Sequence, residues 1–321
     1  MNKISKKQAI GFISTFRAVI ILVIMCMIAA FLSPQFLSVS NLFNVVRQIT
    51  VVAILGCGMT FVILTGGIDL SVGAIIGLAG AISAGVLTYT GNVALAMGAG
   101  LLIGVLCGAA NGFFVAKCGI PPFIATLGMM TLLRGCVLVY TKGAPIPIRE
   151  DAYKWVGKGD LLGVPIPIVL LIVIFALAYF VLGHTKYGRS VYALGGNREA
   201  TRLSGIPVVK TEWITYIISG LMCGIAAIVL TARLGSAQST GGTGYELDAI
   251  AAVILGGTSL SGGVGFVLPT VVGALIMGII DNILTLLNVN PHATNIVKGA
   301  VILIAVLADK KVKDLSTKVN E

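Results

Sequence analysis

Charged side chains are scarce in this sequence, since Asp, Glu, Lys and Arg together make up 11% of its 321 residues. Apolar residues make up 57%, and the mean hydropathy is +1.03. Soluble globular domains do not reach such values, which are typical of proteins that cross a membrane several times. The composition therefore predicts an all-α integral membrane protein.

The sequence also lacks a recognisable catalytic or metal-binding set. Its two histidines, His184 and His292, are far apart, and neither the H-E-x-x-H nor the G-x-S-x-G motif occurs. The six cysteines show neither metal-ligand nor disulfide spacing. The glycine-rich segments lack the lysine and the spacing of a nucleotide-binding P-loop. We therefore expect no enzyme activity, metal or cofactor in this chain, and any ATP must be held by another subunit.

Apolar runs of about 20 residues each predict ten membrane spans. Their approximate bounds are 18–32, 44–64, 70–89, 93–116, 121–140, 166–183, 212–232, 246–260, 265–288 and 292–309. The first and the eighth are short for a full crossing. Ten spans place both chain ends on one side, with a segment 1–17 before the transmembrane domain 18–309 and a tail 310–321 after it. On that same side we expect one long polar loop, 184–211.

The chain carries 22 Lys and Arg against 12 Asp and Glu, a net charge of +10. Basic proteins can bind nucleic acid, but here the basic residues flank apolar runs, so membrane orientation explains them better. With the ten spans, fourteen of them fall on one side and five on the other. Because cytoplasmic loops are rich in Lys and Arg, both ends and the 184–211 loop are predicted to be cytoplasmic. We expect no nucleic-acid partner.

Residues 186–210 form the one long, strongly basic segment between apolar runs. Within it, Asn197 can accept a backbone N–H at a helix N-cap, and Glu199 and Ala200 favour a first helical turn. Gly205 then ends the helix, and Pro207 prevents it from resuming at once. The pattern predicts a short helix of about two turns that lies across the membrane face.

Through Glu199, Ala200 and Gly205, this loop resembles the E-A-A-x-x-x-G loop of ABC importer permeases, although Thr201 replaces the second alanine. In that family the short helix docks in a groove of the ATPase subunit. The resemblance implies that ATPase coupling rests on Gly195, Gly196, Asn197, Glu199, Ala200, Gly205 and Ile206. The alternative is that a basic loop only fixes the topology.

Nearly the whole chain resembles the sugar branch of these permeases, the membrane subunits of bacterial ribose importers. The resembling stretches include GMTFVILTGGIDLSVG, GRSVYALGGNREATRLSGI and GTGYELDAIAAVILGGTSLSGG. The resemblance implies a multi-pass subunit that works as a homodimer among the lipids of the bacterial cytoplasmic (inner) membrane. It also implies an ATPase that holds ATP and Mg²⁺, and an extracytoplasmic binding protein that delivers a monosaccharide, with D-ribose as first choice. Permeases for galactose, xylose, allose and autoinducer-2 look similar.

Polar residues within apolar runs are costly in lipid, so we expect them to face a cavity or a partner. A path for an uncharged, hydroxyl-rich solute is predicted to involve Asp69, Ser71, Asn111, Asp281, Asn282 and Asn295. The alternative is structural, with Asp281 paired to Lys298 and Asn111 bonded to an adjacent helix. An ion-coupled secondary transporter is the runner-up function. It requires titratable groups near the midplane, where Asp281 is the main candidate.

Two glycine-rich turns, VILTGGIDLSVG (62–73) and VILGGTSLSGG (253–263), resemble each other. Such similarity is common in transporters built from two repeats, but chance matching in so apolar a chain is a serious alternative. Each turn offers glycines for a tight reversal. Asp69 or Ser259 follows them, and we expect each to be the N-cap of the next helix.

Overall fold

The computed structural model describes the backbone of residues 3–320 and the side chains of residues 18–307 apart from Pro291. The basic side chains of the predicted terminal segments, 1–17 and 310–321, therefore lie outside the described residues.

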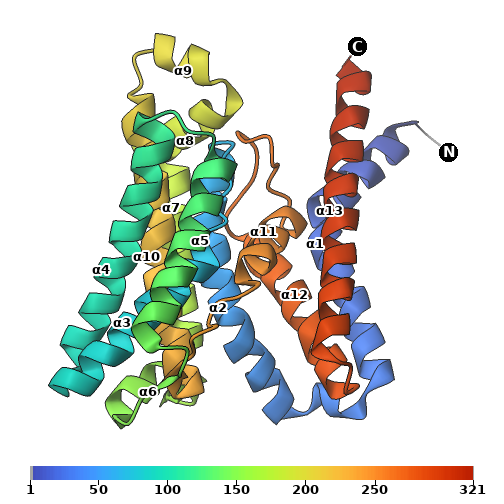
Figure 1. The fold of residues 1–321 in the computed structure, drawn as a ribbon. Coiled ribbons are helices and arrows are strands. Elements are labelled where there is room, and N and C mark those ends of the chain that lie inside the picture. The colour runs from blue at the N-terminus through green and yellow to red at the C-terminus, as the bar shows by residue number, and fades with distance from the viewer. Residues whose placement is uncertain (1–2, 321) are drawn as a thin grey trace.

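Most of the described chain is helical (Figure 1). The helices are α1 (Lys3–Leu32), α2 (Val39–Leu64), α3 (Val72–Thr90), α4 (Val93–Gly112), α5 (Pro122–Thr141), α6 (Asp151–Lys158), α7 (Ile166–His184), α8 (Lys186–Gly196), α9 (Arg198–Leu203), α10 (Val208–Leu234), α11 (Tyr245–Leu255), α12 (Pro269–Leu286) and α13 (Pro291–Asn320). A 3₁₀ turn, η1 (Pro34–Leu37), precedes α2, and a π-helical turn, η2 (Phe113–Lys117), extends α4. Two antiparallel pairs of short strands join β1 (Ile146–Pro147) to β4 (Ser236–Ala237) and β2 (Asp160–Leu161) to β3 (Val164–Pro165).

Seven helices in the described part of the chain are long and apolar enough to cross a membrane, namely α2, α3, α4 with η2, α5, α7, α10 and α12. The apolar stretches Ala18–Leu32 of α1 and His292–Leu307 of α13 are shorter. The prediction of an all-α membrane protein is thereby confirmed. Helix α11 is shorter than the predicted span 246–260, because Gly256 caps it after Leu255 and Gly257 takes a φ of +94°.

Helix α2 forms the centre of the bundle. Every residue from Ile49 to Leu64 is buried, and the helix packs against α7, α10, α11 and α12. A helix that is apolar on all sides is typical of a protein core or of a membrane span, and here α2 takes the core position. Helix α2 therefore fixes the positions of its neighbours.

Helices α4 and α10 are joined by two G-x-x-x-G pairs that face each other, Gly104 and Gly108 on α4 and Gly220 and Gly224 on α10. A Cβ at Gly108 or Gly220 would meet the backbone of the other helix. Small residues at such positions let two membrane helices approach backbone to backbone.

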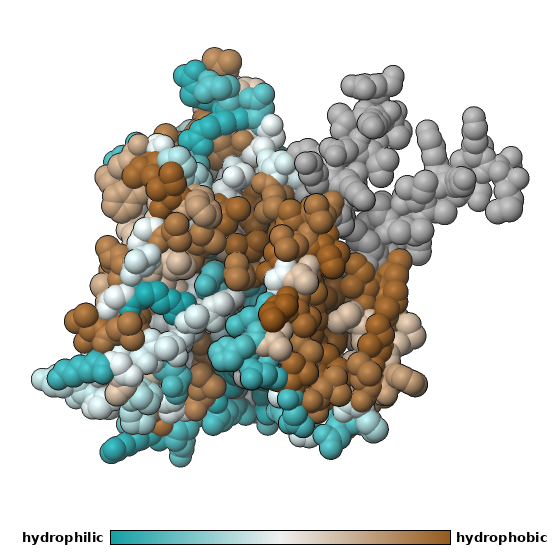
Figure 2. Space-filling view, turned by 45° about the vertical axis from the view of Figure 1, so that its right-hand side comes forward, coloured by the Kyte–Doolittle hydropathy of each residue, from teal (hydrophilic) through white to brown (hydrophobic). Residues whose placement is uncertain are grey.

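Helices α8 and α9 lie at one end of the bundle, together with the first turns of α1 and the last turns of α13, whereas α6 lies at the other end (Figure 1). We call these the α9 end and the α6 end. Figure 2 shows hydrophobic residues over much of the middle of one face, interrupted by hydrophilic patches, and more hydrophilic residues at the top tip and along the bottom. This distribution suits a protein whose middle contacts lipid.

Candidate functional sites

The predicted short helix after Asn197 is confirmed. Asn197 is extended (φ −159°), and its Oδ1 accepts the backbone N–H of Ala200 at 2.9 Å. Helix α9 follows and ends at Leu203, and Gly205 takes the left-handed φ of +78° that favours glycine. The N-cap and the stop therefore lie where the sequence placed them.

Most of α9 is exposed, including Glu199 and Ala200, and the side chain of Leu203 at its tip is 79% exposed. Thr201, which stands where the family motif has its second alanine, is instead buried, and its hydroxyl donates to the carbonyl of Asn197 at 2.7 Å. The departure from the motif therefore lies on the inner side of α9. Glu199 and Ala200, which match the family motif, lie on the exposed side.

An ion pair ties α9 to α10. Arg198 donates from Nη1 to Glu212 Oε1 at 2.9 Å and from Nη2 to Oε2 at 2.7 Å, and Glu212 is buried. The hydrogen bonds to Glu212 raise the pKa of Arg198 above its usual value. Sequence reasoning missed Glu212 because it read this residue as the boundary of a span. A lone acid at the start of an apolar run, shortly after a basic helix, was the available signal.

Two glycine-containing turns and the end of α8 meet, and we call their residues 64–67, 262–263 and 195–196 the glycine junction. The N–H of Gly263 donates to the carbonyl of Leu64 at 2.9 Å. A Cβ on Gly195 would collide with that same carbonyl, and one on Gly262 would lie 2.9 Å from the nitrogen of Gly66. The two similar turns of the sequence are thus in contact with each other and with the end of α8.

Three of the predicted path residues form one buried cluster, here named the Asp69 cluster, between α3, α4 and α10. Ser71 donates through its hydroxyl to Asp69 Oδ1 at 2.6 Å, and Asn111 Nδ2 donates to Ser71 Oγ at 2.7 Å. Ser219 of α10, which sequence reasoning missed, donates to Asp69 Oδ2 at 3.0 Å. All four side chains are at most 1% exposed, and the bonds join neighbouring helices.

The expectation that Asp69 and Ser259 are N-caps is wrong. Helix α3 has Ser71 at its N-cap, and Asp69 instead accepts the backbone N–H of Ser71 at 3.0 Å. Ser259 lies well before α12, which begins at Pro269. Four glycines with positive φ between positions 257 and 265 keep the chain in an irregular loop there.

The other predicted path residues lie among α2, α11, α12 and α13. Lys298 Nζ lies 2.9 Å from Oδ2 of both Asp248 and Asp281, which confirms the anticipated pairing of Asp281 with Lys298. These three residues and Asn295 line a cavity of about 430 Å³. Asn282 points elsewhere and exchanges two hydrogen bonds with Asn41 of α2, at 2.9 and 2.8 Å.

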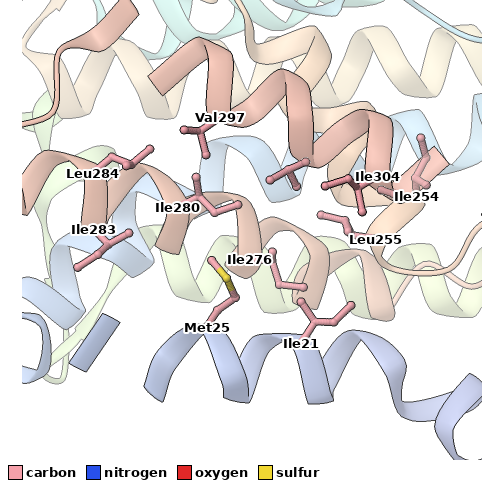
Figure 3. A pocket seen from close by; sticks show the side chains of 12 residues that line it. Ile21, Met25, Ile254, Leu255, Ile276, Ile280, Ile283, Leu284, Val297 and Ile304 are labelled. Atoms are coloured by element: carbon pink, nitrogen blue, oxygen red, sulfur yellow. The ribbon is translucent and has the colours of Figure 1, made fainter. Parts of the chain in front are cut away.

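A second cavity of about 390 Å³, between α1, α11, α12 and α13, is lined by apolar side chains such as Met25, Ile280 and Val297 (Figure 3). Its lining side chains offer no hydrogen-bonding N–H or O–H group. It therefore does not suit a hydrophilic solute.

Among the side chains described, no group of His, Cys, Asp or Glu could hold a metal ion. The geometry thus presents an exposed short helix at one end of an apolar bundle, and a charged cavity inside it.

Comparisons with known proteins place this bundle in a family. Residues 41–306 match the family described as the permease component of the branched-chain amino acid transport system. The chain is 49% identical to the ribose import permease protein RbsC of Escherichia coli strain K12, over 92% of this chain and 93% of that protein. It is 37% identical to two further proteins of that strain, the L-arabinose transport system permease protein AraH (91% and 89% covered) and the probable ABC transporter permease protein YphD (99% and 96%). No solved structure gives a significant match.

Family and helices together describe a multi-pass protein of the inner membrane. The family match and the matches to these relatives each cover most of the chain. The chain therefore belongs to the family of transport-system permease components.

Proposed function

We propose that this chain is the permease subunit of an ATP-driven ABC importer that moves a monosaccharide, with D-ribose the best candidate, across the inner membrane. The observation that carries the proposal is the exposed, capped helix α9 between two spans, which presents Glu199 and Ala200 on its outer side. The name of the RbsC relative supports ribose as the solute. L-Arabinose is the second candidate, because the less similar AraH relative is an arabinose permease by name.

The proposal includes ten spans with both ends in the cytoplasm. Seven helices supply spans by length and composition, and the apolar stretches of α1 and α13 together with the short helix α11 would supply the other three. The α9 end also carries the first turns of α1 and the last turns of α13 (Figure 1), as an even number of crossings requires. The α9 end is then the cytoplasmic end.

Two copies of the chain would form the translocating unit, with an ATPase at the α9 end and a binding protein at the α6 end. ATP and Mg²⁺ belong to the ATPase, and this chain contributes no catalytic group. The exposed face of α9, with Leu203 at its tip, is the proposed docking surface for the ATPase.

Force applied to α9 has two routes into the bundle. The Arg198–Glu212 pair leads to the N-terminal part of α10. The glycine junction leads from α8 to the end of α2 and to the loop before α12. Closure of the ATPase would therefore shift α9 and, with it, the helices that carry the proposed path residues Asp69, Ser71, Asn111, Asp281, Asn282 and Asn295.

The test is uptake by liposomes that contain the permease, its ATPase and its binding protein. We expect D-[¹⁴C]ribose to accumulate only when the ATPase is supplied with ATP, and unlabelled D-ribose to compete better than L-arabinose. ATP-dependent uptake of arabinose in preference to ribose would show that the substrate is L-arabinose. Accumulation by the permease alone under a proton or sodium gradient would favour the secondary transporter, which the titratable Asp248–Lys298–Asp281 cluster makes the second candidate.

A further inference from the structure

The cavity among α2, α11, α12 and α13 has walls from four separate segments of the chain. Gln48 lies on α2, Asp248 in the first turn of α11, Asp281 on α12, and Asn295 and Lys298 on α13. Its volume of about 430 Å³ falls within the range of about 300–1,000 Å³ that small-molecule sites occupy. Helix α11 is a half-length helix whose N-terminus opens on this cavity, an arrangement that transporters use at solute sites.

Three of the four charged residues that line this cavity hold one another in place, and the fourth, Glu246, lies 3.8 Å from Arg134. Lys298 lies between Asp248 and Asp281 and contacts one oxygen of each, at 2.9 Å in both cases. The second oxygen, Oδ1, of each carboxylate accepts no hydrogen bond from the side chains described. The cluster therefore offers two fixed acceptors at little cost in conformational entropy.

Two amides in the same cavity have unused hydrogen-bonding capacity. Neither Gln48 nor Asn295 forms a side-chain hydrogen bond within the described part of the chain, although both line the cavity. Each amide provides a donor and an acceptor. A hydroxyl group also donates and accepts, so amides and carboxylates together match a ligand with several hydroxyls.

Other ligand classes fit less well. The cavity is lined by three carboxylates, those of Glu246, Asp248 and Asp281, and by the one ammonium of Lys298, and this excess of negative charge disfavours an anion. A small cation would have to replace Lys298 Nζ, which already occupies the position between the carboxylates. A neutral polyol can bind without displacing Lys298 from the two carboxylates.

We propose that this cavity is a solute-contact site for a neutral polyhydroxylated molecule, with Gln48 and Asn295 contacting the hydroxyls directly and Lys298 positioning the two carboxylates. The inference rests on the proposed function and narrows it. It adds Gln48, Asp248 and Lys298 to the proposed path residues.

The experiment compares Gln48→Ala and Asn295→Ala, which remove hydroxyl contacts without leaving a charge unpaired. The matched control is Asn44→Ala, because Asn44 lies one turn before Gln48 on α2 but outside the cavity. Two quantities are measured: D-ribose taken up per ATP hydrolysed by the reconstituted importer, and the saturation-transfer NMR signal of D-ribose with the permease alone in nanodiscs. Each cavity variant should lower both by about threefold to tenfold, the factor that one hydrogen bond provides, and the control should match the parent.

A parent that transports ribose while both cavity variants equal it in uptake and in NMR signal would overturn the site. An equal loss in Asn44→Ala would overturn it too, since the effect would then be general to α2. A parent that takes up no pentose contradicts the proposed function instead. In that event an NMR signal reduced by both cavity variants, and not by the control, still supports a polyol site.

Discussion

Gly195 and Gly196 are neighbours in the sequence but have opposite surroundings. A Cβ on Gly195 would collide with the carbonyl of Leu64 and approach the nitrogen of Gly263 within 2.4 Å, whereas one on Gly196 would meet nothing within 4 Å. The atoms that Gly195 touches belong to the backbone and cannot rotate away. The sequence presented the two glycines as equivalent, and only their contacts separate them.

We therefore expect Gly195→Ala and Gly196→Ala to differ sharply. Overpacking at the glycine junction should cost Gly195→Ala about 1–3 kcal/mol of stability and lower ATP-driven uptake. Gly196→Ala should be neutral or slightly stabilising, because alanine favours a helix more than glycine does. Thermal unfolding in detergent and uptake by the reconstituted importer measure both effects. Similar values for the two variants would show that the junction is not closely packed in the membrane.

At the scale of single elements, much of α9 could be predicted because its signals are local. Asn197, Gly205 and Pro207 act on the backbone within a few residues of themselves. The partners of this segment could not be predicted in the same way, because the packing of other helices brings Glu212 to α9 and Gly263 to the end of α8. The same limit applies to the cavity: the polar residues were visible, but nothing local separated Asp281, which lines it, from Asn282, which bonds to Asn41.

Helix α9 can be tested by two substitutions that act differently. Gly205→Val places a β-branched residue at φ +78° and should cost about 1 kcal/mol or more through backbone strain. Ala200→Trp leaves the fold intact, since Ala200 is exposed, but should overfill the groove of the ATPase. Both variants should insert in the membrane normally and lose ATPase association or the stimulation of ATP hydrolysis by loaded binding protein. Retention of the ATPase and of parental transport by both would contradict the coupling role of α9.

At the scale of the whole molecule, apolar length and charge asymmetry anticipated a helical bundle, and the helices follow the predicted runs closely. The count of crossings is harder to read, because α11 is only 11 residues long and α1 and α13 each extend well beyond their apolar parts. A hydropathy pattern gives only the length of each apolar run along the sequence. Whether a short helix completes a crossing depends on the loops that pack around it.

Reporter fusions test the proposed orientation. An enzyme that is active only outside the cytoplasm should be active when fused after Lys158, at the end of α6, and silent when fused after Arg198, at the start of α9. The reason is that the α9 end carries the excess of basic residues. The reverse pattern of activity would show that the orientation in the membrane is the opposite of the one proposed. Activity at both positions would show that the number of crossings between them differs from the one proposed.

The backbone contact between α4 and α10 has a mechanical consequence. Because glycine faces glycine, no side chains that could change rotamer lie between the two helices. The two helices should therefore move together as one rigid unit. Helix α10 has 27 residues and is therefore about 40 Å long. Glu212, the partner of Arg198, is the fifth residue of this helix. At its other end, Gly235 and strand β4 follow the last turn, and β4 pairs with β1. A tilt of α10 imposed at α9 should therefore move the β1–β4 pair at the opposite end of α10 by a comparable amount.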